Sequence, residues 1–188
     1  MNSNNYSLPS NWVDFICTKD NLSMVWEKLN QFPILFDDSV RNDYNHFLRE
    51  MLDPSSIIMF TGDYGIFRCC NIIPYRECDI HLSFWDKRFR GRLEECSQVL
   101  KWLFNKLKLH RANIEVPSIT YSTINFIKAL GFKIEGKRRD SWQVNGRYLD
   151  VIEFGILDND IFELKQLTGE KDGKQTETND KNIVNASL

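Results

Sequence analysis

The spacing of apolar side chains changes along the chain in a way that separates helices from strands. A short apolar-rich run at residues 12–17 is typical of a first strand. Apolar residues then recur every three or four positions, which predicts helices over residues 22–32 and 39–52. Asp20 or Asn21 is the expected cap of the first of these helices. The N-terminal part is therefore predicted to be one strand followed by two helices.

The rest of the chain alternates between strand-like and helical segments. Asn145-Gly146 lies between two strand-like runs, which is the strongest short-range signal for a β-hairpin. Three consecutive strands with short links indicate an antiparallel meander, and a strand, a long helix and another strand indicate a crossover between parallel strands. The predicted strands cover residues 55–63, 65–76, 77–85, 112–116, 133–144 and 147–157, and the predicted helices cover residues 91–109 and 120–130.

This order of elements predicts a single mixed sheet flanked by helices, in the α/β (α+β) class. The expected organisation is a flexible leader at residues 1–10, one domain at 11–158 and a polar tail at 159–188. The tail has no pattern that could form a core, and we expect it to be disordered.

Composition narrows the class of protein. The net charge of −2 over 188 residues favours neither nucleic acid nor an anionic membrane as a partner. The N-terminus lacks the order of a signal peptide, which favours a cytoplasmic location, and no apolar run is long enough for a membrane span. The five cysteines show no C-x-x-C spacing, so neither a disulfide framework nor a metal site is expected.

The candidate for chemistry is the junction between the third strand of the meander and the long helix. A basic loop with one glycine, Gly91, leads into the helix, and three arginines surround that glycine. The first N–H groups of a helix have no internal partners, and together with the helix dipole they bind phosphate. The alternative is that these arginines are simply the solvated start of a helix.

Two stretches of the chain resemble the GNAT (Gcn5-related N-acetyltransferase) superfamily. The first, residues 88–93 (RFRGRL), is similar to the motif [RQ]-x-x-G-x-[GA], although Leu93 stands where Gly or Ala is usual. The second, residues 126–136 (FIKALGFKIEG), continues through Asp140 to residues 146–150 (GRYLD) and resembles the branch of ribosomal-protein Nα-acetyltransferases and spermidine-type acetyltransferases. The resemblance extends from about residue 55 to residue 157.

The resemblance implies a fold and a donor site. The GNAT fold has a mixed, mostly antiparallel sheet of about seven strands with about four helices, and its fourth and fifth strands splay apart into a V-shaped slot. Acetyl-CoA would bind there, with its pantetheine arm along the fourth strand and its pyrophosphate on the basic loop. Ile127 stands where many relatives carry a Tyr as general acid. The implied donor-binding residues are Leu82, Ser83, Phe84, Arg88, Phe89, Arg90, Gly91, Arg92, Leu93, Thr120 and Thr123.

Polar residues on the strand before the loop are the candidates for catalysis. Glu77, Asp79 and His81 alternate along it and so share one face. In histone-type relatives a general-base Glu lies at the distance from the loop that Glu77 has here, so Glu77 is the first candidate. The alternative is that these three residues simply form an exposed polar face of the strand, without a catalytic role. Asp37 and Asp38, in the linker between the first two helices, are candidates for contact with a cationic substrate.

The sequence therefore predicts an acetyl-CoA-dependent N-acetyltransferase without a metal, acting by direct transfer in a ternary complex. The acceptor would be a protein N-terminus, a lysine or a small amine. Two alternatives stay open: a GNAT-fold binding or structural protein without activity, and a nucleic-acid modifier on the same scaffold. The oligomeric state is open too, with a homodimer as one alternative.

Overall fold

The computed structural model describes residues 6–62, 64–86 and 93–161. Seven strands and four α-helices follow one another in these residues, with one short 3-10 helix, and residues 158–161 at the end of the described range are helical too. In chain order the elements are β1 (Val13–Asp14), α1 (Lys19–Leu29), η1 (Pro33–Leu35), α2 (Tyr44–Met51), β2 (Ile57–Phe60), β3 (Gly65–Ile73), β4 (Glu77–Phe84), α3 (Leu93–Leu107), β5 (Arg111–Pro117), α4 (Tyr121–Ala129), β6 (Lys133–Val144) and β7 (Arg147–Leu157).

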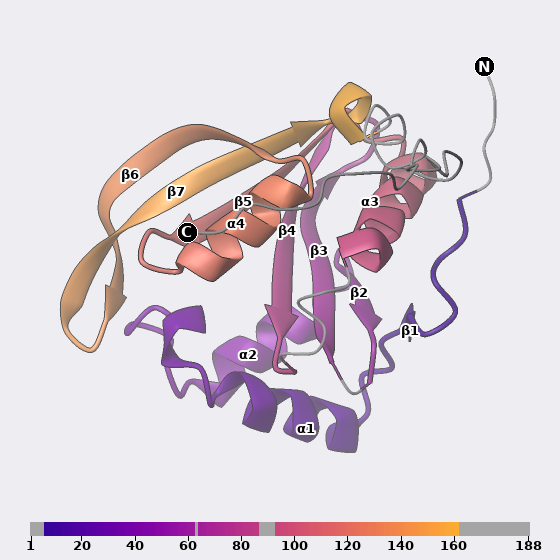
Figure 1. Cartoon of the computed structure of the whole chain (residues 1–188). Coiled ribbons are helices and arrows are strands. Elements are labelled where there is room, and N and C mark those ends of the chain that lie inside the picture. Colours follow the sequence, from indigo (N-terminus) through magenta and orange to yellow (C-terminus); the bar gives the residue numbers. More distant parts are fainter. Residues whose placement is uncertain (1–5, 63, 87–92, 162–188) are drawn as a thin grey trace, which may run out of the picture.

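The strands form one sheet in the order β1-β2-β3-β4-β5-β7-β6 (Figure 1). All neighbouring strands are antiparallel except β4 and β5, which are parallel and connected through α3. The meander, the crossover and the closing hairpin are therefore confirmed.

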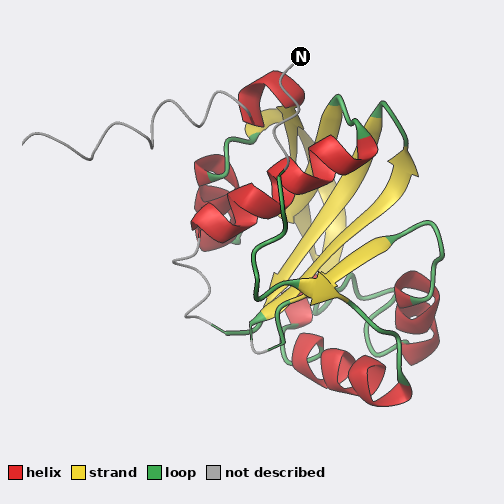
Figure 2. Cartoon of the chain, turned by 90° about the vertical axis from the view of Figure 1, so that its right-hand side faces the viewer, coloured by secondary structure: helices red, strands yellow, loops and turns green. Residues whose placement is uncertain are grey.

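Helices cover the two faces of the sheet unequally (Figure 2). Helices α3 and α4 pack on one face over a core that reaches from β2 to β7 and includes Phe67, Ile80 and Phe154. Helices α1 and α2 form a second, smaller cluster on the opposite face, against Ile58 and Ile66 of β2 and β3. The part of this opposite face that belongs to β4, β5 and β7 carries polar residues instead, and we call it the polar face.

The expected V-shaped splay is present between the two parallel strands. β4 and β5 pair at only three positions, from Glu77↔Arg111 to Asp79↔Asn113. Beyond Asp79, β4 continues to Phe84 alongside β3 alone, while β5 continues to Pro117 alongside β7. Among the described residues, the edge of β4 that faces β5 therefore has no strand partner from Ile80 onward.

Three boundaries near the N-terminus differ from the sequence-based expectation. The first strand is only Val13–Asp14, because Trp12 turns into the main core. Helix α1 is capped by Thr18, whose hydroxyl accepts the N–H of Asn21 at 3.2 Å, and not by Asp20 or Asn21. Helix α2 begins at Tyr44 behind Asp43 rather than at residue 39, because the preceding residues are bound to the β6–β7 hairpin.

The described part of the chain packs on the core at both of its ends, and the expected domain limits stay a prediction. Leu8 packs against the main core, and Ile161 is buried within it. The tail from residue 162 lies outside the described residues, so its expected disorder stays a prediction. No helix among the residues described is long and apolar enough to cross a membrane.

Candidate active site at the split between β4 and β5

The polar face arises from the alternation of side chains along β4 and β5. Cys78 and Ile80 point into the main core, so Glu77, Asp79 and His81 point to the other side. On β5, Ala112, Ile114 and Val116 are buried in the same core. Arg111, Asn113 and Glu115 therefore share the polar face with the β4 residues. The three catalytic candidates named from the sequence do lie together, next to the split.

Asp79 lies where the two strands separate, and both of its carboxylate oxygens are occupied. The side-chain amide of Asn71 donates to Oδ2 at 2.8 Å, and that of Asn113 donates to Oδ1 at 3.1 Å. Asn113 also accepts from Arg111 Nε at 2.6 Å, and Arg111 pairs with Glu135. Asp79 is thus the centre of a hydrogen-bonded network that crosses from β3 to β6.

His81 is the first residue of the polar face beyond the last β4–β5 pair. It is exposed to solvent and lies opposite Arg68 of β3, which pairs with Glu50 of α2. Desolvation by the surrounding protein lowers the pKa of the imidazole, and the charge of Arg68 lowers it further, against the smaller opposing effects of Glu50 and Asp79. These effects favour a neutral imidazole, the form that can accept a proton.

Glu77 lies at the paired end of β4, beside Arg111 of β5. Its Oε1 is 3.2 Å from Nε of Arg76, and about a quarter of its side chain is exposed. Glu77 and His81 therefore lie on opposite sides of the point of divergence, with Asp79 between them.

The predicted donor-binding residues occupy different parts of the split. Leu82 and Phe84 pack against the main core, and the Phe84 ring meets Phe126 of α4 edge-on at 6.2 Å. Ser83 lies on the polar face, opposite Ile66 of β3. Phe84 thus links the end of β4 to α4.

Two of the implied donor-binding residues, Thr120 and Thr123, lie at the start of α4. Thr120 precedes α4, and its hydroxyl donates to the carbonyl of Pro117 at 2.7 Å. Thr123 is exposed on the first turn of the helix. Ile127 is buried in the main core, so this position presents no polar group to the split.

The basic loop itself cannot be described. Arg88, Phe89, Arg90, Gly91 and Arg92 lie outside the described residues, so their expected grip on a pyrophosphate stays a prediction. Leu93 is the first residue of α3, and 37% of its surface is exposed. β4 ends at Phe84, and the 15-residue helix α3 begins at Leu93.

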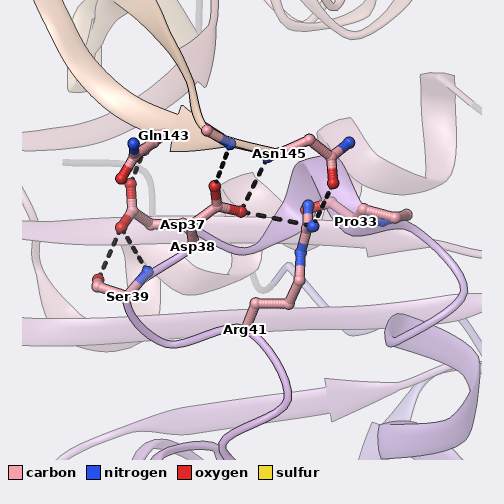
Figure 3. Close-up of polar contacts among 8 residues, drawn as sticks. Pro33, Asp37, Asp38, Ser39, Arg41, Gln143 and Asn145 are labelled. Carbon is pink, nitrogen blue, oxygen red and sulfur yellow. Dashed lines mark hydrogen bonds and ion pairs between the residues drawn. The ribbon is translucent and has the colours of Figure 1, made fainter.

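Asp37 and Asp38 contact the β6–β7 hairpin (Figure 3). Asp37 Oδ2 accepts the backbone N–H of Gln143 at 2.6 Å, while its Oδ1 accepts from Ser39. Asp38 accepts the backbone N–H groups of Asn145 and Gly146 at 3.0 and 2.7 Å, one on each oxygen. All four oxygens thus have partners within the chain, and the predicted contact with a cationic substrate stays untested.

Sequence reasoning missed the residues that surround the three candidates. Arg111, Asn113 and Glu115 alternate in the segment RANIEV, a signal that could have placed them on one face. Arg68 and Asn71 carried no such signal, because their role depends on the register of β3 with β4. No group of three or more His, Cys, Asp or Glu residues in the described ranges could hold a metal ion.

Comparisons with known proteins identify the fold. No family model and no curated protein sequence matches the chain. A spermidine N-acetyltransferase from Vibrio cholerae, solved with CoA and spermine, is similar with a TM-score of 0.65 at 16% identity, over 82% of this chain and 99% of that one. A probable acetyltransferase is similar with a TM-score of 0.62 at 19% identity, over 82% and 97%.

The chain therefore has the GNAT fold. Both solved structures are covered almost completely, so the shared region is their whole domain and not a fragment. The fold class that the sequence predicted is confirmed, including the splay of the fourth and fifth strands.

Proposed function

We propose that this chain is an N-acetyltransferase that moves an acetyl group from acetyl-CoA to a primary amine by direct transfer in a ternary complex. The observation that carries the proposal is the split itself. Among the described strands, β4 parts from β5 after Asp79, beside a face with a carboxylate and an imidazole. CoA is bound in the similar V. cholerae enzyme.

The donor would lie along β4. An extended pantetheine arm can run along β4 beyond its last pair with β5, beside Leu82 and Ser83, as a peptide adds to the edge of a sheet. The loop at residues 88–92 and Leu93 would hold the pyrophosphate through N–H groups at the start of α3. Thr120 and Thr123 would line the arm from the side of α4.

The transfer needs an unprotonated amine. In the proposed reaction the amine nitrogen attacks the thioester carbonyl carbon, the C–N bond forms, the C–S bond breaks, and the amine loses a proton. We assign that proton to His81, directly or through water, because His81 lies beside the open part of the split and its lowered pKa keeps the ring neutral. Glu77, at the end of β4 that is paired with β5, is the alternative base. Asp79 would hold the strands at their point of divergence.

The acceptor we favour is a cationic amine. Four guanidinium groups near the split pair with carboxylates: Arg68 with Glu50, Arg76 with Glu77, Arg111 with Glu135, and Arg138 with Glu115 and Glu153. With Asp79, the carboxylates of this set outnumber the guanidinium groups. An acidic surface attracts a protonated amine before it is deprotonated for transfer. A polyamine, a lysine side chain and a protein N-terminus all meet this requirement.

The test is release of free CoA thiol from acetyl-CoA over a panel of spermidine, a lysine-containing peptide and peptides with free N-termini. Saturable release with at least one acceptor, and its loss in His81→Ala, is the expected result. Acetyl-CoA at a hundred times its Kd should also stabilise the protein by about 2.7 kcal/mol. For a chain of this length that corresponds to a rise in Tm of about 5–10 °C. The proposal would be contradicted if acetyl-CoA did not stabilise the protein and no amine of the panel were acetylated.

One observation supports an alternative function, that of a CoA-binding protein without transfer activity. Ile127 is buried where many relatives have a Tyr, so the usual proton donor to the thiolate is missing at this position. Stabilisation by acetyl-CoA without thiol release from any acceptor would favour this alternative. The cytoplasmic location remains an inference from the sequence.

A further inference from the structure

Arg68 is the charged side chain that lies across from His81 in the sheet. The two residues are directly opposite each other on the antiparallel strands β3 and β4. Phe67 and Cys69, the chain neighbours of Arg68, belong to the main core, so Arg68 points to the same side as His81. Opposite residues of an antiparallel pair have Cβ atoms about 4.5–5.5 Å apart. A substrate that reaches His81 therefore comes within reach of the longer Arg68 side chain.

The guanidinium group of Arg68 is only partly used within the chain. Its Nη1 pairs with Glu50 of α2. Its Nε is buried and has no hydrogen-bond partner, and its Nη2 donates to none of the described residues. The side chain as a whole is 13% exposed, so the group is not sealed off from solvent. Arg68 thus keeps hydrogen-bond donors that no residue in the described ranges fills.

The other guanidinium groups near the split are more fully used. Arg111 engages all three of its nitrogens, because Nε donates to Asn113 at 2.6 Å and both terminal nitrogens donate to Glu135. Arg138 is shared between two carboxylates. Donors that are left unfilled in a largely buried group carry a desolvation cost, which a ligand with acceptor atoms removes. This contrast singles out Arg68 as the residue that meets a ligand.

Glu50 holds Arg68 in place and balances its charge. Helix α2 is fixed on the sheet because Phe47 and Met51 pack in the smaller cluster with residues of β2 and β3. Glu50 belongs to the same helix, so its carboxylate meets Arg68 from a fixed direction. Its negative charge offsets that of the guanidinium group, and the pair therefore does not repel a protonated amine that approaches the split.

The unfilled donors define what an acceptor molecule has to carry. Guanidinium N–H groups bind carbonyl and carboxylate oxygens, and they cannot bind an ammonium group, which has no acceptor atom. A protonated polyamine offers donors alone. In a lysine side chain a four-carbon stem separates the amine from the backbone. Among these acceptors, only an α-amine has a carbonyl or carboxylate carbon bonded to the same carbon atom as its nitrogen.

We propose that Arg68 is a specificity-determining residue, which binds the carbonyl or carboxylate oxygen beside an α-amino group while His81 takes the proton of that group. The acceptor is then a peptide N-terminus or a free amino acid, and not a polyamine or a lysine side chain. This inference rests on the proposed transferase function and narrows its acceptor. The bonds that form and break are those of the proposed transfer, and Arg68 neither gains nor loses a proton.

The first test compares acceptors with the wild-type, full-length protein, through release of CoA thiol from acetyl-CoA. Peptides with free N-termini and free alanine carry the required oxygen, whereas spermidine and isopropylamine do not. Isopropylamine is the matched acceptor, because a methyl group replaces the carboxylate of alanine in it. Since α-amines are less basic than other alkyl amines, kcat/KM is expressed per unprotonated amine.

We expect the better of the two oxygen-carrying acceptors to exceed spermidine and isopropylamine by about tenfold or more. The reason is that a site built to bind a polar group rejects a substrate that lacks it. Faster transfer to alanine than to the peptides would assign the contact to a carboxylate, and the reverse order would assign it to a carbonyl.

The second test uses Arg68→Met, which removes the donors and keeps an unbranched side chain. Arg49→Met is the matched control, because Arg49 is next to Glu50 on α2 but is exposed and lies 3.8 Å from Asp43. In Arg68→Met we expect KM for the preferred α-amine to rise about tenfold or more, since a hydrogen bond from a charged group is lost. A change in the protonation of His81 affects all acceptors alike. The ratio of kcat/KM between the α-amine and isopropylamine therefore measures the contact alone, and the control should keep the wild-type ratio.

Two further measurements separate loss of this contact from damage to the protein. The rise in Tm with acetyl-CoA should be the same in Arg68→Met and in the wild type, because the proposed donor contacts do not include Arg68. Arg68→Lys keeps the charge and a donor but not the planar fork, so it should recover part of the loss.

Each contrary result has its own meaning. A wild type that prefers spermidine or isopropylamine would overturn the assignment of the acceptor and leave the transferase function standing. An equal loss with every acceptor in Arg68→Met would overturn the contact, since a general effect on His81 or on the fold acts in this way. Stabilisation by acetyl-CoA without transfer to any acceptor would overturn the proposed function, and this inference with it. If Arg68→Met does not fold, Arg68→Lys and the wild-type comparison still decide.

Discussion

Replacement of Gly65 by alanine tests whether the end of β4 has to stay where it is. Gly65 is the first residue of β3 and pairs with Phe84, the last residue of β4. A Cβ atom at Gly65 would lie 2.8 Å from the Phe84 Cα and closer still to the Ser83 carbonyl oxygen and the Phe84 ring. Real Cβ atoms essentially never come nearer than 3.0 Å to another heavy atom, and backbone cannot rotate away as a side chain can. The alanine must therefore displace the end of β4.

The cost follows from two opposing effects. Overpacking in a closely packed region costs about 1–3 kcal/mol. Alanine also makes the unfolded chain less flexible than glycine does, which stabilises the folded state by about 0.4–1 kcal/mol. The middle of these ranges gives a net destabilisation of about 1.3 kcal/mol. For a protein of this length that is a fall in Tm of roughly 3–5 °C. If the shift also breaks one backbone hydrogen bond to the donor, worth about 0.5–1.5 kcal/mol, CoA should bind roughly 2- to 13-fold more weakly.

Thermal unfolding without ligand and calorimetric titration with CoA measure the two effects separately. Gly136→Ala is the control, since its Cβ would meet only the Oε2 end of the Glu153 side chain closely, and a side chain can move aside. A Gly65→Ala protein that melts at the wild-type temperature would refute the packing argument. One that melts lower but binds CoA with wild-type affinity would refute the assignment of the donor to this edge of β4.

The remaining predictions concern the polar face and the core. Arg68→Met should raise the pKa of His81, because it removes a nearby positive charge, and Glu50→Gln should lower it; the His81 signal in an NMR titration reports both, with His110 as reference. In the wild type the folded state binds the His81 proton less readily than the unfolded state, whose pKa is near 6.5, so this residue makes stability fall as pH decreases below that value. Asp79→Ala should cost about 1–3 kcal/mol in a urea titration, because it removes the shared acceptor of two side-chain amides, and an unchanged midpoint would show that water replaces it fully. Phe67→Ala, at a fully buried position of the main core, should cost about 3–5 kcal/mol, and a smaller loss would mean that the core collapses around the cavity. Glu77→Gln should keep most of its activity across pH if His81 is the base, and a steep loss would transfer that role to Glu77.

Some features of this protein were fixed by local sequence. Strands β6 and β7 have the predicted limits of residues 133–144 and 147–157, because two strand-like runs joined by an Asn-Gly turn are a strong local signal for a hairpin. The polar face of β4 was predictable for the same reason, since a period of two places Glu77, Asp79 and His81 on one side wherever the strand lies. The resemblance in residues 88–93 and 126–136 supplied the fold class, which the solved structures confirm.

Only the tertiary structure decided how these pieces combine. Strand register decides where β4 and β5 separate. It also brings Asn71 and Asn113 together at Asp79. Register leaves no periodic pattern in the sequence. The two aspartates expected to face a substrate hold a hairpin that is 106 or more residues away in the chain. Because of this contact, α2 begins at Tyr44 and not at residue 39. Residues bound to a distant backbone cannot join the helix that their own pattern favours. Local patterns thus determine the elements and their faces, whereas contacts between distant segments determine what each polar side chain is free to do.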